Sequence, residues 1–235
     1  MNVRRMPSIL RSLLIALPLL AVACGSADSP HSQAVTGAAA QRQTEPERRH
    51  ASRRIVFLGD SLTAGLGLPR EQSTPSLIQD RLTAEGYDYE VINAGVSGDT
   101  SAGGLSRLDW SLDGDVEILV IELGANDGLR GLPIAQMKRN LNEIIVRAQA
   151  RDITVILTGM EAPPNYGPLY TAEFRKVFRD LADDHDVVFV PFYLDGVAGI
   201  ASLNNADGIH PNAEGARLVA GTIWRALEPV LDKDR

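Results

Sequence analysis

The residues best suited to chemistry in this sequence are a serine near its beginning and an aspartate and a histidine near its end. Ser61 is the third residue of Gly-Asp-Ser-Leu at 59–62, and it follows the apolar run 55–58. Asp207 and His210 lie three residues apart. A serine hydroxyl becomes a nucleophile when a histidine takes its proton and a carboxylate orients that histidine. We expect Ser61 to be the nucleophile, His210 its base and Asp207 the group that orients the imidazole.

The choice of histidine follows by elimination. The chain has four, and His31 and His50 lie in the polar stretch before the apolar run. His185 stands among acidic residues at 183–186, where contact with a helix C-terminus and nearby acids accounts for it. His210 remains, on a turn before a helix with Pro211 in the first-turn position that tolerates proline. A lone Asp-x-x-His can also be a capping turn, so its weight comes from occurring together with Ser61.

Acyl transfer also requires donors for the negative oxygen of the tetrahedral intermediate. We expect these to be the backbone N–H groups of Ser61 and Gly95 and the side-chain amide of Asn126. Glycine at 95 permits the backbone to approach a substrate closely. Asp60 and Asp127 adjoin these residues, and we expect them to make hydrogen bonds within their loops.

The elements that must position these groups alternate between strand and helix. Strands are expected at 55–58, 89–93, 117–123, 153–158 and 187–192, and helices at 75–85, 134–150, 171–184 and 212–230. The alternation predicts an α/β fold with three layers, α/β/α, around a flavodoxin-like five-stranded parallel sheet. The candidate groups all follow strand ends or precede the last helix, so they should converge at one edge of this sheet. The segment 160–170 has three prolines and reads as a long loop, either a simple connection or one that contacts substrate.

Several competing motifs are missing from the sequence. It contains no Gly-x-Ser-x-Gly elbow, no Gly-x-Gly-x-x-Gly and no Gly-Lys-Ser/Thr phosphate loop. Metal sites generally use several His or Cys ligands, and only one histidine is suitably placed. We expect no cofactor and no metal. Two alternatives stay open: a metal phosphohydrolase using Asp60, Asp127, Asp207 and His210, or a surface lipoprotein that binds lipid or glycan without turnover.

These blocks resemble the SGNH (GDSL) hydrolase family. The longer strings at 97–101 (SGDTS), 122–131 (ELGANDGLRG), 164–167 (PNYG) and 207–211 (DGIHP) resemble its bacterial thioesterase I/protease I/lysophospholipase and arylesterase branch, and the likeness runs from about 54 to 230. The resemblance implies a serine nucleophile, glycine and asparagine oxyanion donors and a His–Asp pair. These match Ser61, Gly95, Asn126, His210 and Asp207 one by one. It further implies a serine esterase acting on an ester or thioester.

The N-terminal part predicts export. Residues 1–23 have a basic start and a short apolar stretch typical of a signal peptide, too short to span a bilayer. The sequence 20–24 (LAVAC) resembles the bacterial lipobox, which makes Cys24 a candidate lipidated N-terminus; a plain signal peptide with a chance cysteine is the alternative. In this reading 24–52 is a disordered tether and 53–232 the SGNH hydrolase domain. The family's secreted members commonly lack a lipid, so an anchor would change access to substrate. Without an Asp after the cysteine, an outer membrane is the expected destination in a bacterium with two membranes.

The composition limits which classes of partner and substrate we expect. The 235 residues carry a formal net charge of −7, which argues against nucleic acid as a partner. The aromatic content is 5%, so we expect an acyl site lined largely by Leu, Val, Ala and Pro. Such a site suits a fatty-acyl or aryl ester and discriminates weakly between chain lengths. We expect a monomer that meets a small-molecule or lipid ester and reaches the membrane through its anchor.

Overall fold

The protein is represented by a computed structural model that describes residues 53–234. The signal peptide, Cys24 and the tether lie outside the described residues. The described part is built on one sheet whose strands are all parallel and ordered β2-β1-β3-β4-β5. This is the predicted flavodoxin-like order, and the predicted α/β class is confirmed. The strands are β1 (Arg53–Gly59), β2 (Tyr89–Gly95), β3 (Val116–Glu122), β4 (Thr154–Thr158) and β5 (Val188–Val190).

The central strands are continuous apolar runs because both of their faces are covered. The side chains from Ile55 to Leu58 in β1, and Leu119 to Ile121 in β3, are 0% exposed. Such runs are typical of parallel sheets sandwiched between helices, and the burial of their apolar surface favours folding.

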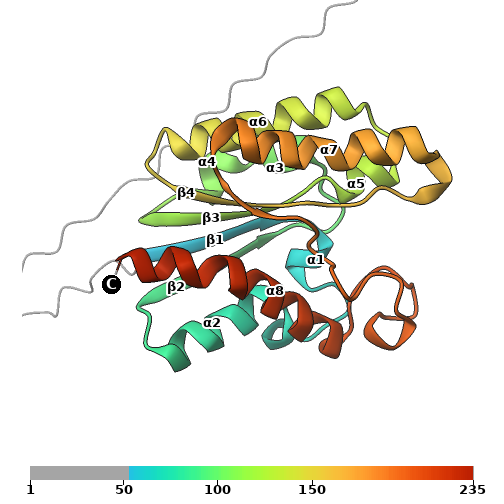
Figure 1. Ribbon diagram of the computed structural model, residues 1–235. Coiled ribbons are helices and arrows are strands. Elements are labelled where there is room, and N and C mark those ends of the chain that lie inside the picture. The colour runs from blue at the N-terminus through green and yellow to red at the C-terminus, as the bar shows by residue number, and fades with distance from the viewer. Residues whose placement is uncertain (1–52, 235) are drawn as a thin grey trace, which may run out of the picture. The chain divides into compact units, whose positions relative to one another are not determined.

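Helices cover the sheet in two layers (Figure 1). One face carries α2 and α8, while α6 and α7 pack together on the other face with α3 beside them. The helices are α1 (Ser61–Ala64), α2 (Thr74–Glu85), α3 (Ser101–Ser106), α4 (Leu108–Ser111), α5 (Ala125–Leu129), α6 (Ile134–Gln149), α7 (Pro168–His185) and α8 (Ala213–Leu231). Short 3₁₀ turns occupy Arg70–Gln72, Pro164–Tyr166, Ala201–Leu203 and Asp232–Asp234. Within residues 53–234 none of the helices combines the length and apolar character needed to cross a membrane.

The structure differs from expectation in several short helices and in the loop before α7. The short helices α3, α4 and α5 were not predicted. In α3 two of the six residues are the poor helix formers Gly103 and Gly104. A Cβ at 104 would lie 2.2 Å from a methyl carbon of Leu123, so tertiary packing selects glycine there. The segment expected to be a loop through residue 170 ends earlier, because α7 begins at Pro168, in the first turn where proline is tolerated. The expected strand ends otherwise coincide with the observed ends or differ from them by one or two residues.

The register of the sheet brings the candidate residues to one edge. Gly59 at the end of β1 is level with Gly95 on one side and with Glu122 on the other. The loops that leave these three strands therefore start side by side, and the candidate site is built at this carboxyl-terminal edge.

Candidate active site

Ser61 stands on a tight turn between β1 and α1. Asp60 caps α1, and its Oδ1 accepts the Leu62 N–H at 3.0 Å. The helix ends at Gly65, which adopts the left-handed conformation with φ 76°. Because α1 has only four residues, its dipole adds little to the stabilisation of charge at Ser61. Individual hydrogen-bond donors must stabilise that charge instead.

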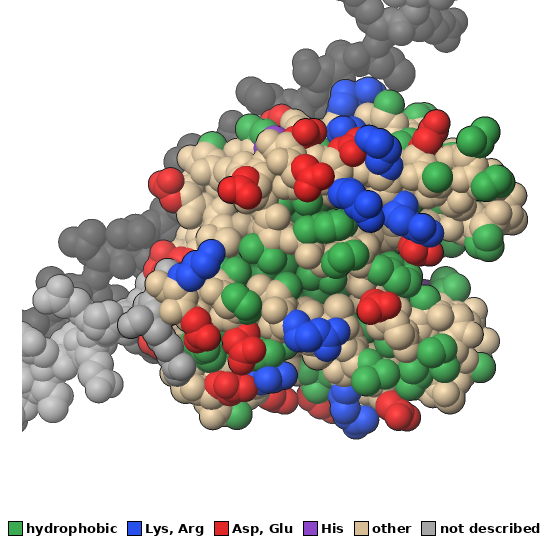
Figure 2. Space-filling model, in the orientation of Figure 1, with side chains coloured by type: hydrophobic (Ala, Val, Ile, Leu, Met, Phe, Trp, Pro, Cys, Tyr) green, Lys and Arg blue, Asp and Glu red, His purple; other side chains and the backbone are tan. Residues whose placement is uncertain are grey.

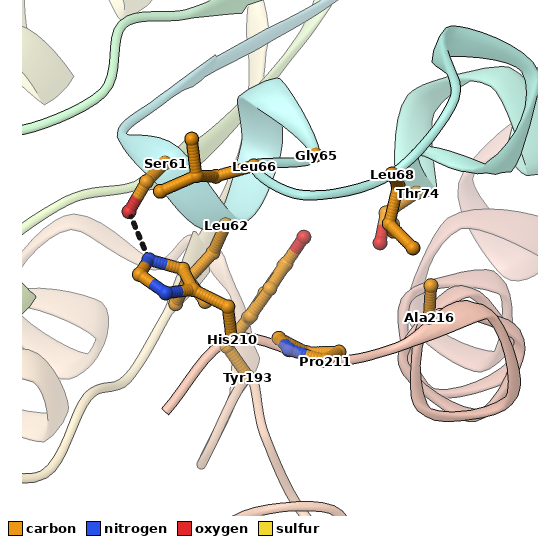
Figure 3. Close-up of a pocket in the computed structure, with 10 residues that line it drawn as sticks. All are labelled: Ser61, Leu62, Gly65, Leu66, Leu68, Thr74, Tyr193, His210, Pro211 and Ala216. Carbon is orange, nitrogen blue, oxygen red and sulfur yellow. Dashed lines mark hydrogen bonds between the residues drawn. The ribbon is translucent and has the colours of Figure 1, made fainter. Parts of the chain in front are cut away.

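The three residues singled out for chemistry form one hydrogen-bonded chain. Ser61 Oγ lies 2.8 Å from His210 Nε2, as the dashed line in Figure 3 shows. His210 Nδ1 lies 2.8 Å from Asp207 Oδ2. With the proton of the neutral ring on Nδ1, facing the carboxylate, Nε2 is left to accept the serine hydroxyl. This is the geometry that deprotonation of a serine requires.

Asp207 is fixed by its own backbone neighbours. Its Oδ1 accepts the N–H groups of His210 and Ile209, each at 3.0 Å. These two bonds, and then the bond to the His210 ring, lower the pKa of Asp207 to about 2. The carboxylate therefore stays ionised above about pH 3 and is available to stabilise an imidazolium.

The loop before α8 positions His210. Its carbonyl oxygen accepts the Asn205 N–H at 2.8 Å, and Gly208 takes the left-handed conformation with φ 77° that the turn requires. The expectation for Pro211 was wrong: α8 is capped by Asn212, and Pro211 lies before the cap in an isolated antiparallel bridge with Asn204. This proline therefore closes the loop and does not start the helix.

The three expected oxyanion donors differ in how they are engaged. The backbone N–H of Ser61 has no acceptor within the described residues. Asn126 gives one N–H of its amide to Asp60 Oδ2 at 2.8 Å, which leaves its second N–H available. The Gly95 N–H donates to Asn93 Oδ1 at 3.0 Å, so it would have to exchange or share this acceptor to reach an oxyanion.

Packing against α1 gives a reason for glycine at 95 besides the expected approach of substrate. A Cβ at this position would lie 2.3 Å from the backbone nitrogen of Ala64 in α1. The close neighbour is the protein's own backbone, so the glycine allows α1 to pack against the end of β2.

The two aspartates beside these residues serve their loops. Asp127 is buried, and its oxygens accept the Ser101 N–H at 2.7 Å and the Ser101 hydroxyl at 2.6 Å, which ties α5 to α3. Asp60 is also buried, and this desolvation raises the pKa of its carboxyl group. Across residues 53–234 no three His, Cys, Asp or Glu side chains are grouped in a way that could hold a metal ion.

A groove of about 690 Å³ opens beside Ser61 and His210. In Figure 2 the surface is hollowed at the end where the strands' carboxyl edge lies, and hydrophobic side chains gather on both sides of the opening. Its apolar lining includes Leu62, Leu129, Met160, Pro164, Phe192 and Ile209. Met160, Phe192 and Ile209 go beyond the expected Leu, Val, Ala and Pro lining. Residues 160–164, part of the expected loop, form one wall.

Behind the serine lies a second, much smaller cavity of about 10 Å³ (Figure 3). Thr74 and Tyr193 line it together with the His210 loop, and Tyr193 reaches toward α1. The buried Tyr193 hydroxyl has no hydrogen-bond partner there within the described residues. The nucleophile thus lies between this small cavity on one side and the larger apolar groove on the other.

One functional side chain that sequence reasoning missed is Arg107. Its guanidinium donates to the carbonyl oxygens of Gly59 at 2.8 Å and Ala94 at 2.6 Å, and to the carboxylate of Asp99 at 2.6 Å. It therefore fixes the ends of β1 and β2 relative to each other. No local pattern marks this arginine, because its bond to Gly59 spans 48 positions of the sequence.

The chain has relatives among known proteins. Residues 57–218 match the model of the GDSL-like Lipase/Acylhydrolase family. The chain belongs to this family. Its relatives include the esterase TesA of Pseudomonas aeruginosa, 44% identical over 182 residues, which cover 77% of this chain and 90% of TesA. The arylesterase of Vibrio mimicus is 40% identical over 178 residues, 75% of this chain and 89% of that protein.

A third relative of this GDSL-like chain is the thioesterase 1/protease 1/lysophospholipase L1 of Escherichia coli, 33% identical over 80% of this chain and 89% of that protein. Among solved structures, TesA superposes with a TM-score of 0.72 over 76% of this chain and 99% of its own, at 44% identity. The SGNH-hydrolase family esterase AlinE4 does so with a TM-score of 0.64 over 77% of this chain and 97% of its own, at 40% identity. The protein is therefore an enzyme of the ester-hydrolase class.

Proposed function

We propose that this protein is a serine esterase that hydrolyses carboxylic ester or thioester bonds through an acyl-enzyme. The observation that carries the proposal is the continuous chain from Ser61 Oγ to His210 Nε2 and from His210 Nδ1 to Asp207, with both links at 2.8 Å. The apolar groove beside Ser61 supports an acyl or aryl substrate, since it can bury a hydrocarbon group next to the hydroxyl.

In the first half-reaction Ser61 Oγ bonds to the acyl carbon while its proton passes to His210 Nε2. The ionised Asp207 stabilises the imidazolium, and the carbonyl oxygen becomes an oxyanion. The N–H of Ser61 and the free N–H of Asn126 are the donors ready for it, with Gly95 as a third once it leaves Asn93. The bond to the alcohol or thiol then breaks, and the leaving group takes the proton from His210.

In the second half-reaction water replaces the leaving group. His210 removes a proton from the water, the resulting hydroxide adds to the acyl carbon, and collapse of the intermediate returns the proton to Ser61. The chain supplies every proton transfer in this scheme, so we propose that no cofactor takes part.

The test is covalent labelling with a fluorophosphonate, which forms a stable bond to an activated serine. We expect the wild-type protein to be labelled at Ser61 and to hydrolyse p-nitrophenyl esters, and Ser61→Ala to lose both while keeping its melting temperature. An Ser61→Ala variant that retained hydrolysis would refute the mechanism. Hydrolysis across acyl chain lengths and leaving groups would then define the substrate.

We further propose that the enzyme acts as an exported monomer anchored to a membrane through lipidated Cys24. The lipobox-like sequence before Cys24 supports the anchor, and a tether of the length 24–52 would let the domain meet lipid esters. Cys24→Ser should move the enzyme from the membrane fraction to the soluble exported fraction. An unchanged distribution would remove the anchor from the proposal.

A further inference from the structure

A buried acid with no role in the triad lies directly under the nucleophile. Glu122 ends β3 and is 0% exposed. Its Oε2 accepts three hydrogen bonds, from the Asp60 N–H at 3.1 Å, the Thr63 N–H at 3.1 Å and the Thr63 hydroxyl at 2.7 Å. Its Oε1 has no hydrogen-bond partner within the described residues. Burying a carboxyl group is unfavourable unless its hydrogen bonds compensate, so a specific use is expected.

The three bonds act on the turn that carries Ser61. Asp60 precedes the serine, and Thr63 follows it by two residues, so one oxygen atom joins both sides of the turn. Gly59 leaves room for that oxygen, because a Cβ at 59 would lie 2.6 Å from it. The turn is therefore held from the sheet side by an acceptor that belongs to a different strand.

The same turn also controls the oxyanion donors. The direction of the Ser61 N–H is set by the plane of the peptide group between Asp60 and Ser61. The Asp60 carboxylate also holds the Asn126 amide, at 2.8 Å. A displacement of Asp60 would thus move two of the expected donors together with the hydroxyl. A misplacement of about 1 Å can reduce a rate by about 100-fold.

We propose that Glu122 is a positioning residue for the nucleophile, whose buried acceptor oxygen fixes the turn from Asp60 to Thr63 and with it the hydroxyl and N–H of Ser61. This inference rests on the proposed function, in which Ser61 attacks the substrate. It assigns the role to the acceptor oxygen of Glu122 and not to its negative charge.

The surroundings of Glu122 favour a neutral carboxylic acid. Burial raises the pKa of Glu122 well above its ordinary value, and the nearby charge of Asp60 raises it further. A proton on Oε1 leaves Oε2 free to accept its three bonds. Glutamine has the same shape and keeps a carbonyl oxygen in that place, whereas leucine fills the space without an acceptor.

The experiment compares Glu122→Gln with Glu122→Leu. We measure kcat and KM for a p-nitrophenyl ester and the rate of fluorophosphonate inactivation, which reports attack by Ser61 alone. We expect Glu122→Gln to stay within about threefold of wild type in kcat. Glu122→Leu should lower kcat and the inactivation rate by about 10- to 100-fold, with KM changed by less than about threefold.

A second pair covers the case in which Glu122→Leu does not fold. Thr63 and Thr158 are both 0% exposed, and each donates its hydroxyl once, Thr63 to Glu122 and Thr158 to the carbonyl oxygen of Ile121. Thr63→Val removes one of the three bonds to Glu122, and we expect it to lower kcat by about three- to tenfold. Thr158→Val is the matched control and should leave kcat unchanged.

The outcomes separate this inference from the proposed function. A folded Glu122→Leu with wild-type kcat, or equal losses in Thr63→Val and Thr158→Val, would overturn the positioning role while leaving the esterase intact. A loss of kcat in Glu122→Gln as large as that in Glu122→Leu would overturn the assignment to the acceptor oxygen. Wild-type protein that fluorophosphonate does not label would overturn both proposals.

Discussion

At the scale of single residues, Asp60 links the nucleophile to the oxyanion donors. Its Oδ1 caps α1 through Leu62, and its Oδ2 holds the side-chain amide of Asn126. A carboxylate can only accept hydrogen bonds, so the Asn126 amide must turn its nitrogen, and not its own oxygen, toward Asp60. One N–H is then committed, and the other is oriented in advance for the substrate. This arrangement costs no reorganisation when the oxyanion forms.

The first prediction concerns this amide. Asn126→Ala should lower kcat by about 100- to 1000-fold, because one oriented donor to the oxyanion is lost, with little change in KM. Steady-state hydrolysis of a p-nitrophenyl ester measures both constants. The control is Asn142→Ala, since Asn142 contacts the ring of His185 far from the groove and should keep wild-type rates. Equal activity of the two variants would exclude Asn126 as a donor.

At the scale of elements, the site depends on the fit between α1 and the ends of β1 and β2. Gly59 and Gly95 are paired in register, and both would clash with α1 if they carried a Cβ. Arg107 holds the same two strand ends through the carbonyl oxygens of Gly59 and Ala94. The two glycines therefore allow α1 to pack against the strand ends, and the Arg107 guanidinium holds those two ends together. Both contacts fix Ser61 relative to Gly95.

The second prediction tests this packing with two glycine variants. Gly95→Ala should lower the free energy of unfolding by about 1–3 kcal/mol and reduce kcat, because the rigid backbone of Ala64 cannot yield to the new methyl group. Gly221 lies within α8 and has no heavy atom within 4 Å of its would-be Cβ. Gly221→Ala should stabilise the protein by up to about 1 kcal/mol. Urea unfolding measures both, and similar effects in the two variants would contradict the packing argument.

At the scale of the whole molecule, the sheet carries buried acids at its functional edge. Glu122 and Asp60 lie close together under the nucleophile, and burial raises the pKa of each. Tyr193 is also buried beside them, and this burial raises its pKa. At pH values just above 4.5, the ordinary pKa of glutamate, the unfolded chain releases the proton of Glu122. The folded protein retains that proton because its Glu122 has a raised pKa. Stability gained from this group is complete at low pH and is lost as pH rises.

The third prediction follows from that sign. The stability of wild type relative to Glu122→Gln should decrease from about pH 4.5 upward, until the raised pKa of Glu122 is passed. The slope should not exceed about 1.4 kcal/mol per pH unit, the value for one proton. Urea unfolding of both proteins at a series of pH values measures the difference. The glutamine variant is the control because residue 122 cannot titrate in it. A difference that stayed constant or increased with pH would show that the acid is ionised in the folded state.

The sequence by itself determined the order of strands and helices, the parallel sheet and the residues worth testing at its edge. Apolar runs such as 55–58 and the helical spacing in 134–150 are local signals, and each reports which face of an element is buried. Alternation of such elements allows few topologies, so the convergence of Ser61, Asn126 and His210 could be expected before any coordinates. The short helix α3 escaped because its two glycines carry no local helix signal.

Only the tertiary structure decided how the site is held together. Glu122 reaches Thr63 across 59 positions of the sequence, and Arg107 reaches Gly59 across 48. Neither contact leaves a periodic pattern, because each depends on the register of neighbouring strands and on a gap left by a glycine. The engagement of the Gly95 N–H by Asn93 was invisible for the same reason. Residue types can be read from the sequence, but a hydrogen bond also needs a distance and an angle. Only the packing of the folded chain sets both.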